Sequence, residues 1–138
     1  MAIRVYDQYQ EAEILNADPL KLVRLMYRAA IDSIAAARRH VQAGQIPERS
    51  RRISRAAAII NELTQSLDRR RGGEIATNLA ELYDYVGRKL VQANIQQLEA
   101  PLIESEELLR TLLEAWEQQT PAQIPARIPE YAPVNYSY

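Results

Sequence analysis

The sequence predicts an all-α protein, an antiparallel up-down four-helix bundle with an N-terminal strap and a Pro- and Tyr-rich disordered C-terminal tail. Proline and glycine fall mainly in short clusters, and apolar residues recur every three or four positions between them, as in amphipathic helices. The 138 residues include no cysteine, yet they suffice to bury a core without disulfides. Short connections make consecutive helices antiparallel, which favours the bundle. Two helical hairpins that complete their core by dimerising are the alternative.

The first helix is expected from Asp18 to Gly44. Asp18 is a suitable N-cap, and Pro19 fits the first helical position, where a missing N–H costs nothing. Gly44 suits the left-handed residue that commonly ends a helix. The apolar stripe between these ends consists of Val23, Met26, Ala30, Ile34, Ala37 and Val41.

The second helix is expected to start near Pro47 and to reach Leu67. Gly72 and Gly73 follow it, and glycine alone adopts a positive φ without steric cost. The glycine pair therefore predicts a tight reversal, a short αα-hairpin. The stripe of this helix is Ile53, Ala56, Ile60, Leu63 and Leu67.

The third helix is expected to run from the glycine pair to about Gln97. The fourth is expected from about Pro101 or Ile103 to Gln119, so residues 18–119 form the bundle domain. Their two stripes are Ile75, Leu79, Leu82, Val86, Leu90 and Ala93, and Leu102, Leu109, Leu112, Leu113 and Trp116.

Two segments flank the bundle. Residues 1–17 could pack against it as a short helix or an extended strap. Residues 120–138 carry four prolines at four-residue intervals, a composition that excludes helix and favours an extended tail. The first residues lack the apolar core of a signal peptide and no apolar run is long enough to cross a bilayer, so we expect a cytoplasmic protein without membrane insertion.

Charge is distributed unevenly along the chain. Residues 1–71 hold 13 basic and 8 acidic residues, and residues 72–138 hold 4 and 10, so the halves carry +5 and −6. In an antiparallel bundle such halves attract one another as neighbouring solvated faces. The basic stretches Arg49–Arg55 and Arg69–Arg71 lack interleaved aromatic residues, so we expect no nucleic acid as a partner.

The residues needed for catalysis are scarce. His40 is the only histidine, and it fits a surface cation near the end of the first helix. Glu104, Glu106 and Glu107 are expected to open the last helix, where carboxylates offset its dipole. No glycine precedes the Lys-Ser/Thr of a phosphate loop. We therefore expect no enzyme, no cofactor and no metal, which leaves surface recognition.

Tyrosines are the clearest candidates for such recognition. Tyr83 and Tyr85 point about 200° apart on a helix, so both cannot face the core. If Leu82 and Val86 face inward, Tyr83 lies at the edge of the core and Tyr85 on the far side. Aromatic residues of this kind suit a surface that is apolar but tolerates water. Further contributors are Tyr6, Tyr9 and Tyr27.

Three stretches together form a specific series: "ADPLKLVRLMYRAAI" from residue 17, "ELTQSLDRRRGGEIATNLAELYDYVGRKLVQANI" from residue 62, and "LLRTLLEAWEQ" near Trp116. This series resembles the FliS family of flagellar export chaperones over roughly residues 5 to 119. The resemblance implies a helical bundle that binds the C-terminal segment of flagellin in the cytosol, prevents its premature polymerisation and assists its type III secretion, without ATP or metal. A disordered amphipathic segment can fold into grooves between helices.

The resemblance also implies positions for the site. The flagellin surface would lie largely on the second, third and fourth helices, with the asparagines offering side-chain amides to the client backbone. The expected groove residues are Tyr27, Asn61, Leu67, Ile75, Asn78, Leu79, Leu82, Tyr83 and Asn94. The residues that match the family's N-terminal segment, and would cover part of the groove as a lid, are Tyr6, Tyr9 and Ile14.

Two other functions stay open at the level of sequence. Arg28 and Ala29 replace the Asp-Gly that is usual in the family. If these changes abolish flagellin binding, the chain would be a helical adaptor or scaffold for another flagellar regulator, such as an anti-sigma factor. A nucleic-acid-binding helical protein that uses the arginine stretches is a weaker one. The tail would be unbound linker or a contact for an export-gate component.

Overall fold

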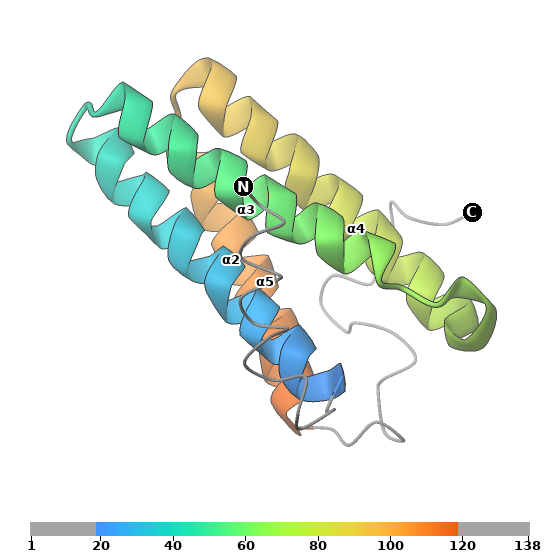
Figure 1. The fold of residues 1–138 in the computed structure, drawn as a ribbon. Coiled ribbons are helices and arrows are strands. Elements are labelled where there is room, and N and C mark those ends of the chain that lie inside the picture. Colours follow the sequence, from blue (N-terminus) through green and yellow to red (C-terminus); the bar gives the residue numbers. More distant parts are fainter. Residues whose placement is uncertain (1–18, 119–138) are drawn as a thin grey trace.

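The computed structural model describes residues 19–118, which form four helices and no strand (Figure 1). These are α2 (Pro19–Gln42), α3 (Ile46–Gln65), α4 (Arg69–Gln96) and α5 (Ala100–Gln118). Each helix packs against its two neighbours around the bundle, α2 against α3 and α5, and α4 against α3 and α5. The predicted all-α four-helix bundle is confirmed, whereas Asp18, the lid residues and the tail lie outside the described residues.

The ends of the helices follow local chemistry. Gly44 has a φ of 69°, as its predicted place at the end of α2 requires. Pro47 occupies the first turn of α3, where a proline is tolerated. Pro101 likewise lies in the first turn of α5, so the last helix starts one residue before the expected position.

The reversal between α3 and α4 differs from the prediction. It starts at residues 66–68, before the glycine pair, because Asp68 caps a first helical turn by accepting hydrogen bonds from the backbone N–H of Arg70 and Arg71, both at 3.1 Å. Gly73 has a φ of 50° and a ψ of −125°, so it separates this first turn from the longer helix that follows within α4. The predicted positive φ is confirmed, and the glycine pair contributes a kink to a reversal that begins at the Asp68 cap.

The core contains residues from all four helices, and it includes Tyr83, which is only 2% exposed. The expectation that Tyr83 lies at the edge of the core is wrong. Its hydroxyl lies 2.7 Å from that of the fully buried Tyr27, and this hydrogen bond offsets the cost of burying two phenols.

Tyr85 was predicted on the far side of the helix, and this prediction is wrong. Its ring packs against the core, and its hydroxyl donates a hydrogen bond to Glu104 of α5. Lys89 Nζ lies 5.4 Å from the centre of the Tyr85 ring and forms an ion pair with Glu104 at 3.4 Å. Tyr85 thus helps to join α4 to α5.

The charge asymmetry of the chain is realised as ion pairs between α2 and the acidic half. Arg28 pairs with Glu117 near one end of the bundle. Arg38 donates to Glu99 and to Glu106, each at 2.9 Å, and Arg110 donates to Glu106 at 2.8 Å. Burial alone would raise the pKa of Glu106, but the hydrogen bonds from Arg110 and Arg38 hold it below its usual value. We call Arg38, Glu99, Glu106 and Arg110 the ionic cluster.

The acidic residues of α5 therefore act differently from the prediction. The helix starts at Ala100 and its first turn has no carboxylate, so Glu104, Glu106 and Glu107 lie too far along it to offset the dipole strongly. Glu104 and Glu106 instead join α5 to α4 and α2.

Candidate binding groove at one end of the bundle

The α3–α4 turn diverges from the start of α2 and the end of α5, whereas the other end of the bundle stays closed (Figure 1). A groove with a volume of about 490 Å³ lies in this region, and we call it the end groove. Side chains from all four helices line it, and most are apolar. Its lining is Val23, Leu63, Ser66, Leu67, Asp68, Arg71, Gly72, Ile75, Ala76, Leu79, Tyr83 and Trp116.

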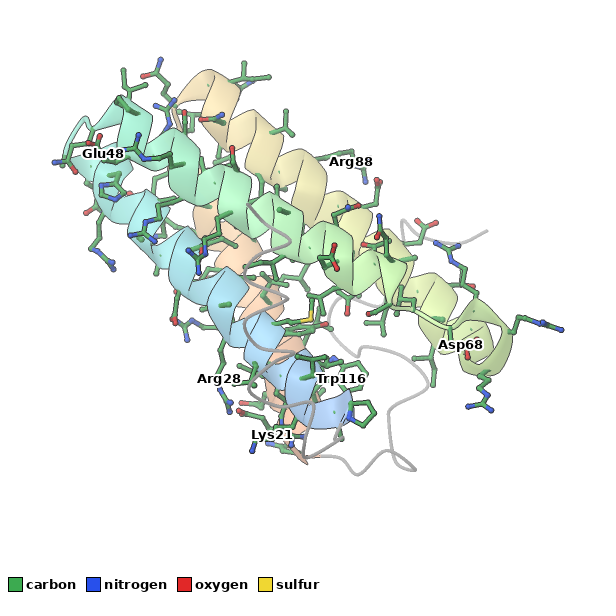
Figure 2. All side chains as sticks on the ribbon, viewed as in Figure 1. Lys21, Arg28, Glu48, Asp68, Arg88 and Trp116 are labelled. Carbon is green, nitrogen blue, oxygen red and sulfur yellow. The ribbon has the colours of Figure 1, made fainter. Side chains whose placement is uncertain are left out.

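The two sides of the end groove come from different parts of the chain. Figure 2 shows Trp116 beside the start of α2 and Asp68 on the α3–α4 turn. Val23 and Trp116 form the α2–α5 side, and both are half-buried against the core. Leu67 and Ile75, also half-buried, lie on the opposite side. The apolar side chains on both walls thus remain partly open to solvent.

Three aromatic rings lie beneath and beside this groove. The Tyr27 ring is 6.3 Å from Tyr83 and 6.4 Å from Trp116, measured between ring centres, with tilted or edge-on packing. Burial raises the pKa of Tyr27 to about 12 and raises that of Tyr83 as well. Both phenols stay neutral at physiological pH, so the floor of the groove carries no charge.

Charge occurs only at the rim of the end groove. Asp68 and Arg71 lie 3.9 Å apart and are both largely exposed, which leaves their pair weak and open to exchange with solvent. Within residues 19–118 no three acidic, histidine or cysteine side chains are arranged to hold a metal ion. The chemistry of the groove is that of an apolar binding surface with a small polar edge.

A family model described as "Flagellar protein FliS" matches residues 2–123. The chain belongs to the FliS family. Three similar relatives are the flagellar secretion chaperones FliS of Salmonella typhimurium, FliSB of Pseudomonas aeruginosa and FliS of Vibrio cholerae. They are 38%, 36% and 32% identical, over 86%, 84% and 80% of this chain and 90%, 95% and 82% of the relative.

Four of the expected groove residues of this FliS-family chain lie together in the structure. They line the end groove and are Leu67, Ile75, Leu79 and Tyr83. Tyr27 lies beneath it as the hydrogen-bond partner of Tyr83. Whether these residues contact a client stays a prediction.

The remaining expected residues lie elsewhere. Leu82 is 1% exposed and belongs to the core. Asn61 is exposed on α3, Asn78 is half-buried on α4, and neither lines the end groove. Asn94 lies near the opposite end of α4, where its side-chain oxygen accepts hydrogen bonds from Arg49 at 3.2 Å and Ser50 at 3.0 Å. Its acceptor is therefore already used within the bundle.

Sequence reasoning placed Val23, Leu63 and Trp116 in core stripes, but the structure gives them a share of the groove. Their position near helix ends was the available signal, since a stripe residue close to a terminus has fewer neighbours to cover it. In residues 19–118 no helix is long and apolar enough to span a membrane.

Proposed function

We infer that this FliS-family chain is a flagellin export chaperone that binds the C-terminal segment of flagellin in the cytoplasm, keeps it from polymerising early and assists its secretion. The family match over residues 2–123 carries this inference, together with the names of the relatives, which are flagellar secretion chaperones. The proposed role is non-enzymatic, since it consists of binding and release.

The end groove is the proposed seat of part of the client. An amphipathic segment buries its apolar face in a groove between helices, and the walls around Leu67, Ile75 and Trp116 offer apolar surface for this purpose. A client without stable structure must become ordered on binding, which costs part of the interaction energy and keeps the complex releasable.

The neutral tyrosine pair supports this assignment. The Tyr27 and Tyr83 hydroxyls share one hydrogen bond, so neither lacks a partner and a client can cover this floor at little desolvation cost. The Asp68–Arg71 pair at the rim can exchange its weak contact for polar groups of the client at little cost.

We further propose that Tyr6, Tyr9 and Ile14 cover the end groove when no client is bound. A lid of this kind protects apolar surface from aggregation and lowers the apparent affinity for the client in proportion to the open fraction. Replacing Tyr6 and Tyr9 by serine should then tighten client binding and increase binding of an apolar dye. Unchanged affinity and dye binding would reject the lid.

Calorimetric titration with the C-terminal segment of flagellin from the same organism tests the main proposal. The expected result is binding near one to one, a negative heat-capacity change and little dependence on salt, because buried apolar surface dominates. Absence of binding by a folded helical protein would refute it and would favour the adaptor function. Steep loss of binding with salt would contradict the apolar mode.

A further inference from the structure

A second, smaller groove follows the outer seam between α2 and α3. It has a volume of about 260 Å³, and no residue of the end groove takes part in it. Three small residues, Ala29, Ser33 and Ala36, are buried here and form its floor. Its longer side chains are Asp32 and Arg39 of α2 and Arg52 and Arg55 of α3. We call it the arginine groove.

The cations of this groove differ from most others on the surface. Arg38, Arg88 and Arg110 each form an ion pair with a carboxylate. Within residues 19–118, by contrast, no ion pair or hydrogen bond engages the exposed side chains of the three groove arginines. Their formal charge, reduced by Asp32, leaves the groove at +2. Each guanidinium offers donors in a fork that fits a carboxylate.

Ser33 adds a hydrogen-bonding group to the floor of the groove. The residue is 3% exposed and forms no hydrogen bond within residues 19–118, but water still reaches its hydroxyl, because the fully buried side-chain oxygen without a partner in these residues is that of Ser105. A molecule seated in the groove can bond to the Ser33 hydroxyl in place of water.

We propose that the arginine groove binds an acidic helical segment of a partner protein. Arg52 and Arg55 are three residues apart on α3 and so lie on one face, with Cβ atoms about 5–6 Å apart. Carboxylates one turn apart on a partner helix have the same spacing and meet both guanidinium groups. Arg39 closes the groove from α2, and the small floor lets the partner helix approach closely.

Asp32 and the absence of aromatic residues among the lining side chains favour a protein over a nucleic acid. A single strand binds by stacking its bases on aromatic rings, and this groove offers none. Asp32 repels a continuous row of phosphates, whereas a partner helix can place a lysine or an arginine side chain against the Asp32 carboxylate. The binding surface does not depend on the flagellin assignment, because the two grooves share no residue.

Fluorescence anisotropy with the full chain tests this proposal. The probe is a labelled alanine-rich helical peptide with glutamates one turn apart, and its matched control carries glutamine at those positions. At low salt we expect the glutamate peptide to bind and the glutamine peptide not to bind. The double variant Arg52→Gln/Arg55→Gln should lower the affinity for the glutamate peptide about tenfold, roughly a factor of three for each lost charged pair. The control Arg69→Gln/Arg70→Gln removes the same charge from exposed positions outside the groove and should change this affinity less than about twofold.

Three results would overturn the proposal. Equal losses in the two double variants would show attraction by net charge alone. A single-stranded oligonucleotide that binds more tightly than the peptide through the same arginines would assign the groove to nucleic acid. If Asp7→Asn/Glu11→Gln/Glu13→Gln raises peptide affinity about tenfold, the acidic N-terminal segment of the chain itself is the occupant. Circular dichroism confirms that each variant keeps its helices, and Ile75→Asp should leave peptide binding unchanged.

Discussion

Replacing Ile75 by aspartate tests whether the end groove holds the client. Ile75 is half-buried on the groove wall, so a bound client would cover what remains exposed. Full burial of an isoleucine contributes about 1.5–3 kcal/mol, and covering the exposed part of Ile75 contributes about half of that. Aspartate loses this contribution and must also be desolvated by an apolar client. We expect a loss of about 1.4–2.8 kcal/mol, which weakens binding by about tenfold to a hundredfold.

A matched control lies on the same helix. Ile95 is 73% exposed and lies 20 residues further along α4, about 30 Å away at the helical rise. Ile95→Asp introduces the same charge and should change client affinity little. Titration calorimetry with the flagellin segment measures both affinities, and circular dichroism checks that both variants stay helical. Undiminished binding by Ile75→Asp, or equal losses in the two variants, would refute the assignment of the client to the end groove.

Three further predictions concern the bundle itself. Leu82→Ala should lower the free energy of unfolding by about 2–5 kcal/mol, because the side chain is buried; an unchanged urea midpoint would place Leu82 outside the core. Tyr83→Phe should cost about 1–3 kcal/mol by leaving the Tyr27 hydroxyl without its partner, and Tyr27→Phe in the same chain should recover part of this; additive losses in a double-mutant cycle would contradict the coupling. The pKa of Glu106 in the folded state lies below the ordinary value of 4.5. The stabilisation of the folded state by ionised Glu106 is therefore complete above pH 4.5 and is lost as the pH falls through the lowered pKa. Urea unfolding should therefore show a loss below pH 4.5 that is smaller in Glu106→Gln, and equal losses in both proteins would reject this role.

The fold could be predicted from sequence because it depends on local signals. The apolar stripes determine which face of each helix is buried, and Gly44 ends α2 with the expected positive φ. The glycine pair was interpreted as the reversal because its conformational freedom is visible in the sequence. The competing signal, the side-chain cap from Asp68, starts the next helix before the glycines.

The site depends on contacts that no local pattern records. Tyr83 is buried because Tyr27, 56 residues earlier, supplies a hydrogen bond across the bundle. The side-chain oxygen of Asn94 is not available to a client, because it accepts a hydrogen bond from Arg49, 45 residues earlier. The end groove itself results from the divergence of two helix pairs, so a stripe residue such as Trp116 can belong to both the core and the groove.

The ionic cluster and the end groove lie at different ends of the bundle, and this separation has a mechanical consequence. Arg38 joins α2 to Glu99, just before α5, and to Glu106, within it, while the walls of the end groove meet mainly through apolar side chains. Apolar contacts slide at small cost, whereas ion pairs with fixed donors do not. We expect the ionic cluster to hold α2 and α5 together as one rigid wall of the end groove. The α3–α4 wall can then shift against it over apolar contacts, so the groove adjusts its width to the cargo while the α2–α5 pair stays intact.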